Sequence, residues 1–161
     1  MASIEQQLKK IIASKAKMKD GLTLEQRLKI EVDRLYNCIQ KYIDEYYDSY
    51  KPSPTGYDRT WRFQGSMYAQ NFLDARVKGN RIELSILFND DLAYHPSLFG
   101  GEEGYVPLLI NDGWHSKKLA DAIGHEVYRL TYYEGYHFIE KGIAEFNQTN
   151  TLGIHIDVYK S

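Results

Sequence analysis

The stretch TLEQRLKIEVDRLYNCIQKYIDEYYDSY, residues 23–50, decides the fold of this chain. Its apolar side chains recur at steps of three and four residues, which is the spacing of one face of an α-helix. These side chains are Leu24, Leu28, Val32, Leu35, Ile39, Ile43 and Tyr46. Thr23 and Gln26 have the spacing of a capping box, and Pro52 and Pro54 cannot continue a helix. The pattern predicts a helix over residues 24–50, about 40 Å long at 1.5 Å per residue.

Length and composition indicate a globular protein with one core. The chain has 161 residues, of which 43% are hydrophobic and 26% charged, close to globular averages. The net charge of -2 provides no global field for nucleic acid. No apolar run reaches the roughly 20 residues of a membrane span, and no signal-peptide core is found at the N-terminus. We therefore expect a protein that is cytosolic when made, with neither membrane nor nucleic acid among its partners.

The N-terminal residues predict a separate element. Residues 3–19 place apolar side chains at helical spacing among five lysines, which indicates a short basic amphipathic helix. Its lysines are either solvated or form a docking arm or a contact with phosphates. Asp20-Gly21 breaks the pattern, so we expect a basic N-terminal helical arm over residues 1–21 and a single α+β domain over residues 22–161.

Residues 60–88 carry the period-two alternation of β-strands. Trp61 and Phe63 alternate with polar residues, which predicts a strand that points both rings inward. A second alternation runs through 71–88 on both sides of Gly79-Asn80, which is a tight-turn pair. The alternating apolar residues are Leu73, Ala75, Val77, Ile82, Leu84, Ile86 and Phe88. The pattern predicts an antiparallel hairpin with one buried face.

The C-terminal part combines a long loop with helices and a strand. Residues 89–118 are rich in glycine and aspartate, and they predict a loop around a short edge strand at 105–110, because Pro107 cannot donate to a central strand. Further elements are predicted as helices over 117–130 and 136–148 and a strand over 154–159. The sum is an α+β fold with a long N-terminal helix, an antiparallel β-sheet with a hairpin, a C-terminal helix packed on the sheet and a final strand.

The histidines and the cysteine give little support to metal or redox chemistry. His125-Glu126 begins the HExxH pattern of zinc proteases, but Arg129 stands where the second histidine is needed. Cys38 is the only cysteine and cannot form an internal disulfide. We expect no metal site and no cofactor.

One pair on a loop has the composition of an acid-base site. Asp112 precedes His115 by three residues, and a carboxylate can orient an imidazole as a general base. A turn at Asp112-Gly113, followed by Trp114 closing the core, explains the same residues. We favour the turn and expect no enzyme activity and no catalytic residue.

The residues after the long helix carry a resemblance to a known family. Tyr50-x-Pro52 is followed by Tyr57-x-Arg59-Thr60 and an aromatic-rich continuation, and residues 135–139, GYHFI, enter the last helix. In these motifs the chain resembles the small head-tail connection and tail-completion proteins of long-tailed bacteriophages and their prophages in Gram-positive bacteria. The order of a long helix, a proline and tyrosine linker, a hairpin, a variable loop and a C-terminal helix and strand is similar over most of residues 22–160.

The resemblance implies a role and partners. The implied role is that of a structural protein in virion assembly, which joins parts at the head-tail junction or completes the tail end and turns over no substrate. The implied partners are other phage structural proteins, such as a connector, the tail tube or a portal-proximal ring, together with further copies of the chain in a ring-like homo-oligomer. The implied location is the virion, and the bacterial host cytoplasm during assembly.

Tyrosine is the residue type that suggests where partners bind. The chain has fourteen tyrosines, and a tyrosine combines a large rigid apolar face with a polar tip, which suits surfaces that meet a partner. The candidate partner interface consists of Tyr46, Tyr47, Tyr50, Tyr57 and Arg59. An alternative function is a small binding or inhibitory module that uses the same Tyr-rich surface on a host protein.

Overall fold

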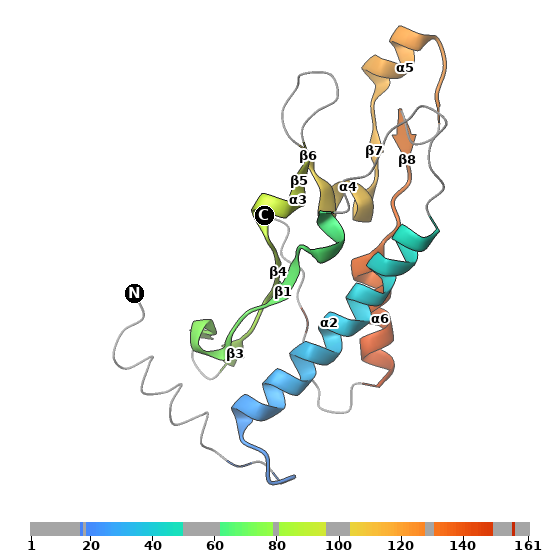
Figure 1. Cartoon of the computed structure of the whole chain (residues 1–161). Coiled ribbons are helices and arrows are strands. Elements are labelled where there is room, and N and C mark those ends of the chain that lie inside the picture. The colour runs from blue at the N-terminus through green and yellow to red at the C-terminus, as the bar shows by residue number, and fades with distance from the viewer. Residues whose placement is uncertain are drawn as a thin grey trace. The chain divides into compact units, whose positions relative to one another are not determined.

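The computed structural model confirms the α+β class (Figure 1). It describes residues 17, 19–49, 62–78, 81–95, 104–127, 131–149 and 156. Contacts within the chain group these residues into two compact units. The first unit comprises residues 1–37 and 67–87, and the second comprises residues 38–66 and 88–161. The expectation of a single domain over residues 22–161 stays a prediction.

The long helix α2, Leu24–Asp48, begins where the sequence predicts. The capping box is formed in both directions: the Thr23 amide donates to Gln26 Oε1 at 2.9 Å, and the Gln26 amide donates to Thr23 Oγ1 at 3.2 Å. Gly21 precedes it with a φ of 81°, a conformation that favours glycine. The first half of α2 belongs to the first unit and the second half, from Cys38, to the second unit. Residues 1–16, which hold most of the predicted basic helix, lie outside the described residues, and Lys17 forms a β-bridge with Thr23.

The second unit is built on the contact between α2 and the C-terminal helix α6, Phe138–Gln148. Gly142 allows the close approach, because a Cβ there would lie 2.8 Å from the Ile39 Cα. The largest fully buried apolar side chains of this unit are Phe138, Phe146 and Ile43. The predicted helix over 136–148 is confirmed, and it packs against α2. Helix–helix packing thus forms the centre of this unit.

Short elements connect the two helices of the second unit. They are η1 Phe63–Gly65, α3 Asp90–Ala93, β5 Tyr94–His95, β6 Gly104–Tyr105, α4 Val106–Asp112, β7 Trp114–His115, α5 Lys117–Ile123 and β8 Tyr132–Tyr133. Strand β5 pairs with β6 and β7 with β8, both antiparallel.

Three local predictions for this unit are corrected. The predicted edge strand at 105–110 is mostly helix α4, because Pro107 lies in the first turn, where its missing amide costs nothing and its fixed φ suits a helix. The predicted strand around Phe63 is the 3-10 turn η1, closed by Ser66, whose amide and hydroxyl both donate to the Phe63 carbonyl. Helix α5 ends at Ile123 because Gly124 adopts the left-handed conformation.

The first unit contains the predicted hairpin. Strand β2, Arg76–Lys78, pairs antiparallel with β3, Arg81–Glu83, so that Val77 lies opposite Ile82. Strand β1, Met67–Ala69, pairs with β4, Ile86–Phe88, whose last residue begins the second unit. Leu73 is wrongly predicted as buried: it lies in the 3-10 turn η2, Phe72–Asp74, and is 83% exposed.

The strands form four separate two-stranded pairs in the part of the chain that the structure describes. Each strand has only two or three residues, so no pair is long enough to support a wide sheet. The predicted final strand over 154–159 lies outside the described residues, apart from Ile156.

Candidate contact surfaces

The predicted partner interface begins at the C-terminal end of α2. Tyr46 and Tyr47 are only 4% and 5% exposed, so they belong to the core of the second unit. The Tyr46 ring lies 5.3 Å from that of Tyr136, and the Tyr47 ring lies 6.3 Å from that of Phe63. Their burial removes both tyrosines from the candidate surface. The other candidates, namely Tyr50, Tyr57 and Arg59, lie outside the described residues.

The aromatic cluster continues from Tyr47 into the centre of the second unit. Phe63, Phe88 and Phe138 contact one another with ring centroids 5.6 to 6.2 Å apart. Phe63 and Phe138 are 3% and 0% exposed. The inward orientation predicted for Phe63 is therefore confirmed, although the backbone there is a turn. The rings of this cluster thus contribute to the core of the second unit, whereas Tyr94 and Tyr132 of the same unit are exposed.

A buried asparagine, absent from the residues predicted to be functional, joins α4 to α6. Asn111 is fully buried, and its Oδ1 accepts a hydrogen bond from the Ile139 amide at 2.9 Å. Its Nδ2 donates to Glu140 Oε2 at 2.9 Å and to Asp112 Oδ1 at 2.8 Å. Asn111 thus satisfies an amide in the first turn of α6, which has no partner within its own helix. The local sequence carries no signal for the contact with α6, because Ile139 and Glu140 lie 28 and 29 residues away.

The two residues considered for acid-base chemistry lie in different elements, Asp112 at the end of α4 and His115 in β7. His115 Nε2 lies 3.0 Å from Glu126 Oε1, and its ring makes an edge contact with Tyr132. Asp112 accepts from Asn111. His115 and Glu126 are both exposed on the surface. Among the described residues no group of three or more metal-ligating side chains is found.

An open groove of about 550 Å³ lies between α2 and α6 in the second unit. Across it, Lys41 Nζ donates to Glu145 Oε2 at 2.8 Å. The hydrogen bond to Glu145 is the main cause of a raised pKa for Lys41 and for Tyr42. In return, Lys41 and then Tyr42 hold the pKa of the Glu145 carboxyl below its ordinary value. The groove is thus bridged by mutually satisfied polar groups that tie the two helices together.

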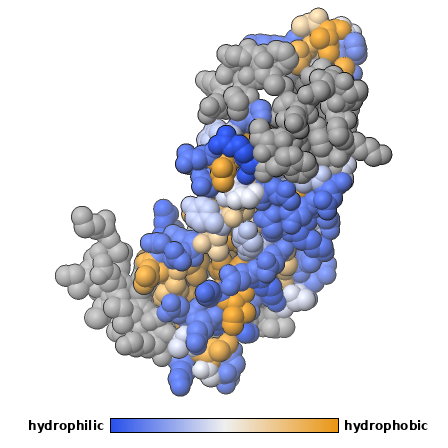
Figure 2. Space-filling model, viewed as in Figure 1, coloured by the Kyte–Doolittle hydropathy of each residue, from blue (hydrophilic) through white to orange (hydrophobic). Residues whose placement is uncertain are grey.

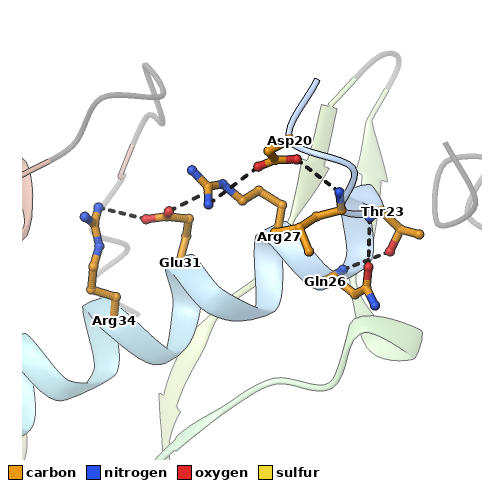
Figure 3. A network of polar contacts seen from close by, with 7 residues as sticks. Asp20, Thr23, Gln26, Arg27, Glu31 and Arg34 are labelled. Atoms are coloured by element: carbon orange, nitrogen blue, oxygen red, sulfur yellow. Dashed lines mark hydrogen bonds and ion pairs between the residues drawn. The ribbon is translucent and has the colours of Figure 1, made fainter. Parts of the chain in front are cut away.

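The first unit has its own polar network along the start of α2 (Figure 3). Arg34 Nη2 lies 2.7 Å from Oε2 of Glu31, a residue only 8% exposed. Arg27 lies 3.7 Å from both Glu31 and Asp20, and Asp20 accepts from the Leu22 amide at 3.1 Å. The network therefore extends from the turn before the helix to its third turn. Alternating charges along it hold the buried Glu31 carboxylate beside cations.

Comparisons with known proteins do not assign the chain to a family. No family model, no curated protein and no solved structure matches it. Among the helices that the structure describes, none is sufficiently long and apolar to cross a membrane.

Proposed function

We propose that the protein is a structural component of a bacteriophage or prophage particle, which acts at the head-tail junction or the tail end. It joins neighbouring proteins through its surfaces and assembles with further copies of itself. Its proposed partners are a connector, the tail tube or a portal-proximal ring, and its proposed location is the virion. This is the role that the resemblance in residues 50–60 and 135–139 implies.

The observation that carries this proposal is the order of the described elements. A long helix, α2, is followed by the hairpin β2–β3, by a segment of short elements and by the helix α6. This is the order expected from the resemblance, and α6 begins within the motif of residues 135–139 that contributed to it. The linker with Pro52, Tyr57 and Arg59 lies outside the described residues, so the motif there supports the proposal by sequence alone.

Polar side chains pair with each other on the described surface of the second unit. Lys41 Nζ donates to Glu145 across the groove, and His115 Nε2 lies 3.0 Å from Glu126 Oε1. Exposed pairs of this kind contribute little to stability and indicate no reaction by themselves. The alternative, a module that inhibits a host protein, depended on a surface that included Tyr46 and Tyr47, which are buried.

The proposal is tested on particles of the phage or prophage that encodes the chain. An antibody against the purified protein, coupled to gold, is expected to label one end of the tail or the neck in negative-stain micrographs. Mass spectrometry of gradient-purified particles is expected to find the protein in a small fixed ratio to the major capsid protein. Its absence from purified particles would overturn the proposal, and its recovery bound to a host protein would favour the inhibitory module.

A further inference from the structure

Charge is divided unequally between the two units. The first unit, residues 1–37 and 67–87, has eleven lysines and arginines against seven acidic residues, a net charge of +4. The second unit has nine lysines and arginines against fifteen acidic residues, a net charge of -6. The two values sum to the net charge of -2 of the whole chain. The small total therefore conceals two units of opposite sign.

The hairpin presents part of the positive charge of the first unit, whose other exposed described cations are Lys17, Lys19 and Lys29. Arg76, Lys78 and Arg81 are exposed, and the pairing of β2 with β3 places Lys78 directly opposite Arg81. Two like charges facing each other across a strand pair destabilise it. Lys78 contacts Glu83 at 3.5 Å, which offsets part of this repulsion. We call this surface the hairpin face. It has three cations and one carboxylate, namely Arg76, Lys78, Arg81 and Glu83.

The last turn of α2 presents an opposite arrangement in the second unit. Glu45 and Asp48 are exposed, and no basic residue lies in this turn. The C-terminal end of a helix carries a partial negative charge, so carboxylates there are unfavourable, and their spacing of three residues adds like-charge repulsion. We call Glu45 and Asp48 the helix end. A cation from outside the chain would stabilise it.

The exposed apolar side chains of the described residues are a second possible signal for a partner. On the face that Figure 2 shows, hydrophobic areas of the described residues are separated by hydrophilic ones. The exposed apolar side chains of the first unit include Ile30, Tyr68 and Leu73, and single residues of this kind are normal on a soluble surface. Surface charge therefore indicates a partner more strongly than the exposed apolar side chains do.

We propose that the hairpin face of one copy of this chain docks on the helix end of a second copy. Each surface repels itself and complements the other, and both occur once in every chain, so the contact is heterologous and can propagate into a ring. The inference rests on the proposed function, because it names the contact by which copies assemble. A second copy is the favoured occupant because every copy carries an acidic counterpart of the hairpin face, namely the helix end.

A charge exchange tests the contact with four full-length proteins. The hairpin variant carries Lys78→Glu and Arg81→Glu, which keeps a like-charge pair across the strands but replaces the contact of Lys78 with Glu83 by a repulsion. The helix-end variant carries Glu45→Lys and Asp48→Lys, which suits the negative end of the helix. The control carries Lys117→Glu and Lys118→Glu, two exposed lysines in the first turn of α5, where carboxylates are favourable.

Analytical ultracentrifugation measures self-association of each protein at about 0.1 M salt and again at about 1 M, where the screening length falls from roughly 10 to 3 Å. We expect the unaltered chain and the control to associate in low salt and to weaken at least about tenfold in high salt. The hairpin variant alone and the helix-end variant alone should remain monomeric. An equimolar mixture of the two variants should associate, because both combinations of surfaces then have opposite charges.

The outcomes separate the proposal from its rivals. A monomeric unaltered chain in low salt would overturn it, as would association of either variant alone or a mixture that stays monomeric. Binding of duplex DNA that the hairpin variant loses, with self-association unchanged, would assign the hairpin face to phosphates. The presence of the protein in particles is measured independently, so a failed contact does not decide the proposed function.

Discussion

Replacement of Gly113 by alanine probes the close approach between the end of α4 and the strand before α6. Gly113 has φ 83° and ψ -173°, a region that is open almost only to glycine. A Cβ there would lie 2.1 Å from the Tyr133 carbonyl oxygen and 2.6 Å from two further backbone atoms. The backbone conformation costs about 1–3 kcal/mol and the overpacking a further 1–3 kcal/mol. We expect Gly113→Ala to lower the free energy of unfolding by about 2–6 kcal/mol.

Gly124→Ala is the matched control for this substitution. Gly124 also has a positive φ, 78°, but a Cβ there would meet no atom within 4 Å. The left-handed conformation is then the only cause of destabilisation, and we expect Gly124→Ala to lower the free energy of unfolding by about 1–2 kcal/mol. Urea unfolding followed by tryptophan fluorescence suits the comparison, because Trp114 adjoins Gly113 and contacts the Tyr133 ring at 4.8 Å. A Gly113→Ala protein as stable as Gly124→Ala would refute the reasoning, whereas failure of Gly113→Ala alone to fold agrees with it.

Three further substitutions test the remaining parts of the fold. Thr23→Ala removes the side-chain acceptor for the Gln26 amide and should cost about 1 kcal/mol in urea unfolding, and no change would show that the capping box contributes nothing. Phe138→Ala, at a fully buried ring, should cost about 3–5 kcal/mol, and a loss below 1 kcal/mol would contradict its place in the core. Glu145→Gln tests the contact with Lys41. Because the pKa of Glu145 is lowered in the folded state, its stabilising effect is present above its ordinary pKa of 4.5 and is lost as pH falls through the lower folded value. The difference in stability between the unaltered protein and Glu145→Gln should therefore shrink from pH 7 to strongly acidic pH, and a difference that grows would contradict the assignment.

The parts of the fold that were predictable from the sequence are those fixed by nearby residues. The start of α2 depends on Thr23 and Gln26, three residues apart, and both hydrogen bonds form as expected. The hairpin depends on alternation around Gly79-Asn80, and Val77 lies opposite Ile82 as the pattern requires. Both signals act within a few residues and need no knowledge of distant partners.

The errors arise where two physical effects compete or where the partner is distant. Pro107 is compatible both with an edge strand and with the first turn of a helix, and the apolar residues after it satisfy either pattern. Composition does not show which tyrosines the fold covers, and it therefore predicts a partner surface at Tyr46 and Tyr47, which are buried. The rings that cover them include Tyr136 and Phe63, which reach α2 only once the chain has folded.

The candidate surfaces also depend on residues that are distant in the sequence. The opposite charges of the two units cannot be seen in the net charge, because the first unit is assembled from two separate stretches of sequence. The like-charge pair of Lys78 and Arg81 follows from the register in which β2 pairs with β3. The exposure of Glu45 and Asp48 beside two buried tyrosines depends on which face of α2 is covered.

The most direct test of the proposed role is deletion of the gene that encodes the chain, followed by induction and purification of the particles that the proposal expects. Electron microscopy of the resulting lysates should show DNA-filled heads and separate tails, or tails with an incomplete end, and expression of the unaltered chain from a plasmid should restore joined, infectious particles. Joined and infectious particles in the absence of the protein would contradict the role in virion assembly.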